Sequence, residues 1–239
     1  MTKIEVLFGI KDKQVKKTCV LAPFIFKIAS DEFRLGPLHR GKLYTSANNK
    51  DFTVIHTGMN AGLTADAALY LESTPCENII LFGSCGLTAE RQGLETGSLV
   101  SPSISYSFES FSRMLLKPEV ELEVSRAHKE LLGRFLNFSR TQKVKEVTCC
   151  TVSSLKLEEE RLDFFTKKAI DVLDMESSAL FAACHHVGIK AIALFYISDI
   201  VNKVNFYAKK NPVQKLALNS SIKEAARLLC SFIKENLTA

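Results

Sequence analysis

Short apolar runs alternate along this chain with longer stretches whose apolar residues recur at helical spacing. The clearest candidates for buried strands are residues 79–83, which read Ile-Ile-Leu-Phe-Gly, and residues 191–197, which are apolar throughout. Residues 64–71 are rich in alanine and leucine, which predicts a helix. By the same reasoning we expect strands at residues 41–46, 52–59, 99–106, 144–152 and 170–174, and helices at residues 120–136, 157–168, 176–187 and 212–237.

The N-terminal part of the chain is less regular. Residues 4–10 and 18–24 are two apolar runs separated by a lysine-rich stretch. They fit either two strands joined by a turn or one strand and an irregular connection. The strand–helix alternation that follows predicts an α/β fold with one mixed, mainly parallel sheet covered by helices. With 239 residues, the chain suits a single domain that spans residues 1–239.

Composition narrows the class of protein further. The chain is 46% hydrophobic and carries a net charge of only +5, with its lysines and arginines scattered, so we expect no nucleic-acid partner. No apolar run reaches about 18 residues, so we expect no membrane partner. The seven cysteines include no CxxC pair, which favours reduced thiols and argues against a metal site. Because the N-terminus also lacks a leader-like segment, we expect a cytoplasmic protein.

Two carboxylate-bearing motifs follow predicted strands. The first is Asp174-Met175-Glu176, and the second is Ser198-Asp199. If both strands are parallel, their C-terminal ends deliver these side chains to one sheet edge, where ligands bind in open α/β sheets. Loss of solvation should raise the pKa of Asp199 and make it a candidate general acid. The structural alternatives are that Asp174 or Asp199 caps the next helix and that Glu176 compensates a helix dipole.

The segment Gly83-Ser84-Cys85-Gly86 is a third candidate. Its glycines, backbone amides and hydroxyl suit a small anion, a water molecule or a sugar hydroxyl. It matches neither a P-loop nor the GxGxxG pattern, and the alternative is a tight turn that merely needs glycine. The pair His185-His186 lies near the end of a predicted helix, where compensation of the helix dipole accounts for it.

Together these motifs resemble the nucleoside phosphorylase and nucleosidase superfamily, over roughly residues 41–237. The matching segments are Thr57-Gly58-Met59-Asn60, residues 79–87, Asp174-Met175-Glu176 and Ile197-Ser198-Asp199. The resemblance implies a three-layer α/β sandwich whose central mixed sheet is partly barrel-like and flanked by helices. It also implies a nucleoside substrate, no cofactor and assembly as a homodimer.

The resemblance assigns roles to individual positions. Glu176 would hold the ribose 2′ and 3′ hydroxyls as an ionised carboxylate, and Asp199 would protonate the base as it departs. Such protonation suits a glycosidic bond that breaks through an oxocarbenium-like state. The other positions implied around the substrate are Met175 under the sugar, Met59 near the 5′ substituent, Ser198 beside Asp199, Ser84 and Gly83 near the nucleophile, and Leu155 where the family carries an aromatic residue.

The nucleophile is predicted to be water. Phosphorylases of this superfamily with the Gly-Ser-Cys-Gly signature carry a phosphate-binding arginine two residues before the first glycine, where this chain has Leu81. Leucine cannot bind two phosphate oxygens as arginine does. The nucleosidases place a water-activating glutamate after the first core strand. Here only Glu32 or Asp12 is available, and neither fits that spacing well.

We therefore predict a hydrolase of purine nucleosides, natural or modified at the 5′ position, of the methylthioadenosine/S-adenosylhomocysteine nucleosidase or futalosine hydrolase type. One alternative is a phosphorylase whose phosphate arginine comes from elsewhere, such as Arg40 or a neighbouring subunit. The other is a nucleoside-binding relative without catalytic activity.

Overall fold

A mixed β-sheet forms the centre of the structure. The computed structural model describes residues 1–24, 27–90, 93–116 and 121–238, and ten strands lie within these ranges. The strands are β1 (Thr18–Ala22), β2 (His39–Arg40), β3 (Thr45–Asn48), β4 (Thr53–His56), β5 (Asn78–Leu87), β6 (Leu99–Phe108), β7 (Glu123–Arg126), β8 (Lys145–Val152), β9 (Val172–Asp174) and β10 (Lys190–Ile200).

Five of these strands close into a ring. The sheet order is β10-β6-β8-β9-β5-β1-β4-β3-β2, and β10 also pairs with β5, so that β5, β10, β6, β8 and β9 surround a common interior. β5 and β10 run parallel over ten residues and are buried along almost their whole length. The predicted mixed, partly barrel-like sheet is therefore confirmed, with parallel and antiparallel neighbours in one sheet.

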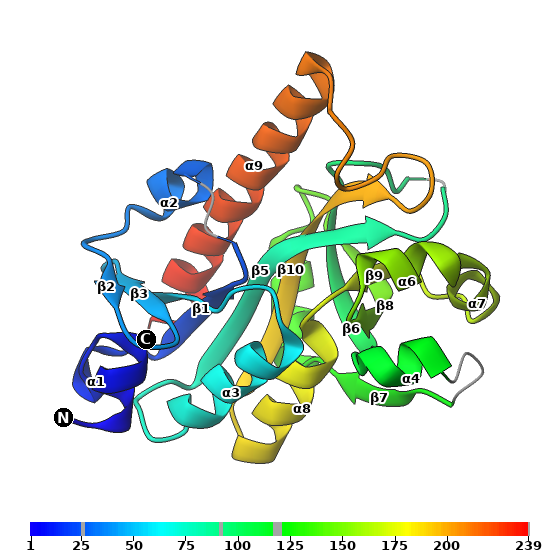
Figure 1. Cartoon of the computed structure of the whole chain (residues 1–239). Helices are drawn as coiled ribbons and strands as arrows, with labels where there is room; N and C mark the ends of the chain where they lie inside the picture. The colour runs from blue at the N-terminus through cyan, green and yellow to red at the C-terminus, as the bar shows by residue number, and fades with distance from the viewer. Residues whose placement is uncertain (25–26, 91–92, 117–120, 239) are drawn as a thin grey trace.

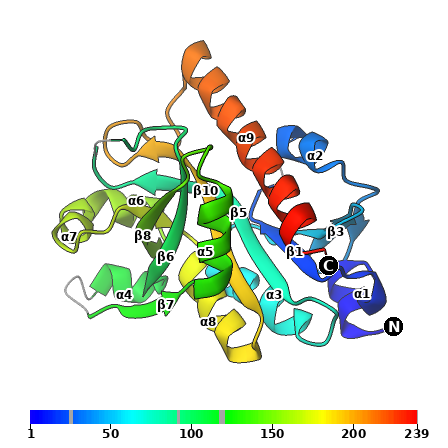
Figure 2. The ribbon, with the colours of Figure 1, turned by 180° about the vertical axis from the view of Figure 1, so that it is seen from behind.

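Helices cover both faces of this sheet, which makes the predicted three layers. Figure 1 shows α3 and α8 in front of it, and Figure 2 shows α5 and α9 on the opposite side. The helices are α1 (Lys3–Phe8), α2 (Lys27–Phe33), α3 (Ala61–Leu71), α4 (Phe111–Leu116), α5 (Lys129–Phe138), α6 (Leu155–Glu160), α7 (Leu162–Lys167), α8 (Ser177–Val187) and α9 (Pro212–Asn236), with a 3-10 turn at Asp12–Gln14. Among the described residues, no helix is both long and apolar enough to cross a membrane.

The N-terminal apolar run is a helix, so its interpretation as a strand is wrong. The hydroxyl of Thr2 accepts a hydrogen bond from the amide of Glu5, and Gly9 ends the helix with φ of 75°. The two buried side chains, Ile4 and Phe8, are four residues apart and face the core together. Phe8 stacks on Tyr44 with 4.4 Å between ring centroids, which anchors α1 against the sheet.

Two predicted helices also differ from the structure. The range 120–136 contains strand β7 and most of helix α5, with His128 accepting from the amide of Leu131 to begin the helix; residue 120 itself lies outside the described residues. The range 157–168 is interrupted at Arg161, which separates α6 from α7. In both ranges a change of backbone direction occurs without a glycine or proline to signal it in the sequence.

Candidate active site

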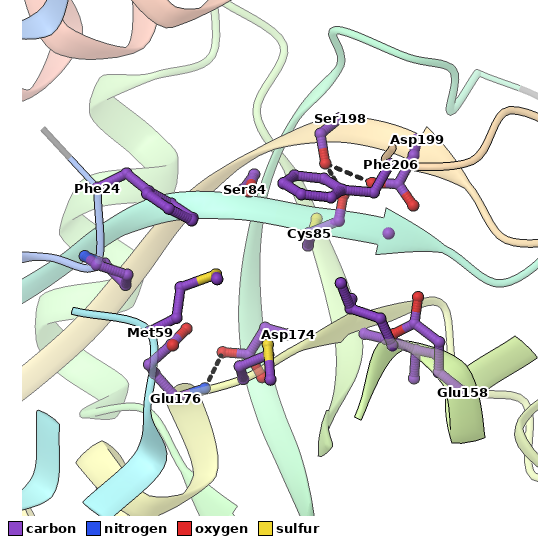
Figure 3. A pocket seen from close by; sticks show the side chains of 15 residues that line it. Phe24, Met59, Ser84, Cys85, Glu158, Asp174, Glu176, Ser198, Asp199 and Phe206 are labelled. Atoms are coloured by element: carbon purple, nitrogen blue, oxygen red, sulfur yellow. Dashed lines mark hydrogen bonds between the residues drawn. The ribbon is translucent and has the colours of Figure 1, made fainter. Parts of the chain in front are cut away.

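A pocket opens beside the C-terminal end of β5, lined by residues of β5, β9 and β10 and of the segments that follow β1, β4 and β8. It encloses about 520 Å³, its open mouth included. Figure 3 shows carboxyl groups at both ends of this pocket. Its lining residues are Pro23, Phe24, Met59, Ser84, Cys85, Gly86, Leu155, Glu158, Leu173, Asp174, Met175, Glu176, Ser198, Asp199 and Phe206.

The two predicted motifs meet in this pocket, but along a different route from the one expected. β10 runs parallel to β5 and brings Asp199 opposite Gly86. β9 runs antiparallel to β5, with Leu173 opposite Gly86, so the two motif-bearing strands are not parallel to each other. The chain after β9 therefore continues back along β5 and leaves Glu176 away from Asp199. Closure of the ring, rather than one shared strand edge, brings the motifs together.

Asp174 is the residue that caps helix α8. Its carboxylate accepts hydrogen bonds from the amides of Ser177 at 2.6 Å and Glu176 at 3.1 Å, and from the hydroxyl of Thr151 at 2.7 Å. Burial raises the pKa of Asp174, although the bonds from Thr151 and Ser177 oppose that shift. The capping alternative thus holds for Asp174, and Glu176 is left without a capping role.

Glu176 is a buried carboxyl with an unused acceptor. The residue is only 5% exposed, and its Oε1 atom has no hydrogen-bond partner in the described part of the chain. Burial and the charge of Asp174 raise the pKa of Glu176 well above its usual value, whereas backbone amides of Met175 and Asn60 lower it. These surroundings therefore favour the protonated form, in contrast to the expected ionised carboxylate. An acceptor buried without a partner invites a hydroxyl donor from a ligand.

Asp199 occupies the other end of the pocket and is 4% exposed. Burial raises its pKa, while a hydrogen bond from Ser198 and the charge of Lys210 lower it. The Ser198 hydroxyl donates to Oδ1 of Asp199 at 2.5 Å and fixes the orientation of the carboxyl. The raised pKa is the direction that the sequence predicted and favours the protonated form of Asp199; its role as a general acid stays a prediction.

Glu158 is a lining residue that sequence reasoning did not single out. It comes from α6, is 7% exposed, and has a pKa raised to about 8 by burial first and then by the charges of Asp199 and Glu159. In the sequence it stands among three consecutive glutamates of an apparently charged helix. Only the apolar Leu155 and Leu157 nearby indicate that this face of the helix turns inward.

Aromatic side chains reach the pocket from unexpected segments. Leu155 does line the pocket, at the position where an aromatic residue was expected from the resemblance. Phe24, after β1, and Phe206, after β10, supply aromatic rings instead. Met59 lies on the same side as Glu176, in the turn before α3.

The glycine-containing segment is part of a continuous strand. β5 extends through Leu87, and neither Gly83 nor Gly86 has a positive φ, so the tight-turn alternative is wrong. Ser84 lines the pocket, whereas Gly83 does not; a Cβ atom at Gly83 would instead lie 3.8 Å from the ring of Phe195. At Gly86 a Cβ atom would stand 3.1 Å from Oδ2 of Asp199, so glycine makes room for the acid.

The two residues considered for water activation lie elsewhere. Glu32 forms ion pairs with Arg227 at 2.8 Å and Lys223 at 3.5 Å, between α2 and α9, and Arg227 lowers its pKa. Asp12 accepts a hydrogen bond from Thr2 beside the N-terminal helix. Neither lines the pocket, and Arg40, exposed in the distant strand β2, does not line it either.

Comparisons with known proteins agree with this architecture. The structure resembles the 5′-methylthioadenosine/S-adenosylhomocysteine nucleosidase of Campylobacter jejuni, with a TM-score of 0.73 at 14% identity, covering 93% of this chain and 100% of that one. It resembles the futalosine hydrolase of Helicobacter pylori with a TM-score of 0.69 at 14% identity, covering 92% and 100%. A uridine phosphorylase of Vibrio fischeri has a TM-score of 0.70 at 19% identity, covering 91% and 93%.

These likenesses establish the fold alone, because hydrolases and a phosphorylase share it at low identity. A search among curated proteins finds no match to this chain. The family model described as the phosphorylase superfamily matches residues 17–234, which includes the pocket and nearly all of the sheet. The chain therefore belongs to the phosphorylase superfamily, a family of nucleoside phosphorylases and nucleoside hydrolases.

Proposed function

We propose that the protein hydrolyses the N-glycosidic bond of a purine nucleoside. The observation that carries this proposal is the separation of two buried carboxyl groups at opposite ends of one pocket. Glu176 offers an unpartnered acceptor at one end, and Asp199 offers a proton at the other. A ribose diol that donates to Glu176 would direct the base toward Asp199.

The reaction needs few groups. Asp199 gives its proton to a ring nitrogen of the base as the bond between that base and C1′ breaks. Water adds its oxygen to C1′, and the proton it loses restores the acid form of Asp199 by way of solvent. The products are free ribose and free base. The positive charge that develops on the sugar is stabilised by the carboxyl of Glu176.

The charge of the pocket supports water over phosphate as the nucleophile. Four carboxyl groups line it, those of Glu158, Asp174, Glu176 and Asp199, and its described lining includes no lysine or arginine. Each of these carboxyl groups repels a phosphate dianion when it is ionised, and no basic side chain of the described lining offsets that repulsion. Leu81, at the position where phosphorylases of this kind carry arginine, is fully buried in β5.

A second function, nucleoside binding without turnover, is favoured by one specific observation. The pocket-lining residues that directly follow β1 are Pro23 and Phe24, and neither can accept a proton from water. Because the oxocarbenium-like state is itself a strong electrophile, we favour hydrolysis despite this difference.

The test is a panel of inosine, adenosine, methylthioadenosine, S-adenosylhomocysteine and futalosine, incubated with the protein in the presence and absence of phosphate. We expect free base together with free ribose, or with the 5′-substituted ribose of the modified nucleosides, at equal rates in both conditions. Asp199→Asn should lower kcat by about 10²–10⁴-fold, whereas the exposed control Glu160→Gln should behave as wild type. A strict requirement for phosphate would refute hydrolysis, and ligand-induced thermal stabilisation without turnover would identify the binding function.

Assembly as a homodimer and a cytoplasmic location also remain predictions. Phe111, Leu115 and Leu116 of α4 and Val124 of the adjacent β7 are exposed apolar side chains, which would be covered at a subunit interface. Light scattering of the purified chain measures its mass and tests the dimer.

A further inference from the structure

Of the four carboxyl groups in the pocket, Asp174 caps α8 and Glu176 and Asp199 act in the proposed reaction, so that Glu158 alone has neither a structural partner nor a task. Helix α6 begins at Leu155, where the hydroxyl of Ser154 accepts a hydrogen bond from the amide of Leu157. This short helix turns Glu158 inward, between Leu157 and the pocket. Its neighbours have partners at the surface: Glu159 accepts a hydrogen bond from the hydroxyl of Tyr207, and Glu160 forms an ion pair with Lys156.

Among the described residues, none donates a hydrogen bond to the carboxyl of Glu158, a residue that is only 7% exposed; unlike Oε1 of Glu176, its oxygens are not completely enclosed. Asp174 shows how the same fold treats a structural carboxyl, by surrounding it with four donors. A buried carboxyl without such donors destabilises the fold, and leucine would fill the same space at lower cost. The group therefore suits a ligand better than it suits the fold.

Its position indicates which part of a ligand it would meet. Figure 3 shows Glu158 and Asp199 facing each other across one end of the pocket, with Glu176 and Met59 at the other. If Glu176 holds the sugar, the base lies at the end of the pocket that Glu158 and Asp199 share, with one edge toward both carboxyl groups. In a purine, the substituent at C6 lies on the same edge as N7, so one carboxyl can serve the ring nitrogen while a second reaches the substituent.

We propose that Glu158 determines base specificity, by donating a hydrogen bond from its carboxyl to the oxygen of a 6-oxopurine base while Asp199 protonates the ring. This inference rests on the proposed function, because it takes the base to lie at the Asp199 end. Burial is the main influence that favours the protonated, donating form of Glu158; the acidic groups that face it, Glu159 on the same helix and Asp199 across the pocket, act in the same direction whenever they are ionised. Lys210 acts on Asp199 from the segment after β10.

The experiment compares inosine, adenosine and purine riboside, which has no substituent at C6. We expect Glu158→Ala to lower kcat/KM for inosine by about 10–100-fold, as loss of one buried hydrogen bond does. Its effect on purine riboside should stay below about 3-fold. Glu158→Gln keeps an N–H donor in the same place and should retain activity on inosine within about 5-fold. Glu160→Gln, on the exposed side of the same helix, is the matched control.

Binding of free hypoxanthine, adenine and purine, measured by calorimetry, separates this inference from the proposed function. We expect the wild-type protein to bind hypoxanthine more tightly than purine. Loss of this preference in Glu158→Ala, and its retention in Glu158→Gln, would support the role of Glu158 even if no nucleoside is cleaved. If Glu158→Ala still cleaves nucleosides and its kcat/KM falls equally for inosine and purine riboside, or falls for neither, the role of Glu158 is overturned. The proposed hydrolase activity is then unaffected. Absence of base binding by the wild-type protein overturns it as well.

Discussion

Replacing Glu158 by glutamine should change how the stability of the protein depends on pH. The wild-type carboxyl is buried beside Asp199, which raises its pKa to about 8 from a usual value of 4.5. In the unfolded chain the group loses its proton near pH 4.5, whereas in the folded chain it keeps the proton until about pH 8. The folded state thus binds more protons than the unfolded state between these two values, so stability falls as pH rises through this window.

The magnitude follows from proton linkage. The wild-type protein should lose about 1.4 kcal/mol of unfolding free energy per pH unit relative to Glu158→Gln, up to a total of about 5 kcal/mol. Below about pH 4.5 and above about pH 8 the difference should be constant. Against a typical total stability of about 5–15 kcal/mol, such a change is large enough to measure.

The assay is urea unfolding of both proteins from pH 4 to pH 9, with the difference in unfolding free energy plotted against pH. Taking the difference removes the contributions of Asp174 and Glu176, which both proteins share, and leaves those of Glu158 and of its interaction with Asp199. Glu160→Gln, whose side chain is exposed and paired with Lys156, should give a difference that is flat with pH. A difference that is equally flat for Glu158→Gln would show that the carboxyl ionises freely in the folded state, and the donor role argued for it would then fail.

Three further outcomes are expected. Gly86→Ala places a Cβ atom 3.1 Å from Oδ2 of Asp199 and should lower kcat for base release about 10-fold with an unchanged circular dichroism spectrum; full activity would show that Asp199 is free to move. Thr151→Val removes the hydroxyl that donates to Asp174 at 2.7 Å and accepts from the amide of Ser178 at 2.8 Å, and should destabilise the protein by about 2–3 kcal/mol in urea unfolding; Thr151→Ser, which keeps the hydroxyl, should lose less. Six cysteines are buried and burial raises the pKa of Cys230 to about 11, so the native protein should react with a thiol reagent at pH 8 far more slowly than the denatured protein, which should show seven thiols.

The sequence was sufficient for those parts of the fold that repeat a simple pattern. The apolar runs of β5 and β10 predicted buried parallel strands, and the structure pairs them over ten residues. The run at residues 4–10 was misassigned because its apolar content suits either a strand or a helix, and the caps at Thr2 and Gly9 decided the outcome. The direction of β9 could not be read from its own three residues, since it depends on which neighbours close the ring.

The sequence likewise identified some residues of the candidate site and missed others. Asp199 and Glu176 were found because each lies at or just after the end of a strand and matches a motif. Glu158 was missed because its environment is created by tertiary contact with Asp199, which lies 41 positions later in the sequence. Glu32 was considered for water activation from its position after β1, but its ion pairs with α9 hold it away from the pocket. Local sequence therefore indicates which carboxyl groups lie at strand ends, whereas which of them share a cavity depends on the closed sheet.

The protonation state of Glu176 affects whether this pocket accelerates the reaction or only binds the substrate. Burial and the charge of Asp174 raise the pKa of Glu176 and favour its neutral form. As the glycosidic bond breaks, positive charge develops on the ribose beside this carboxyl and favours ionisation, because a nearby cation lowers the pKa of an acid. The attraction between Glu176 and the sugar thus becomes stronger in the transition state than in the bound substrate. Interactions that strengthen only at that point increase the rate of the chemical step, whereas equally strong binding of substrate and transition state does not.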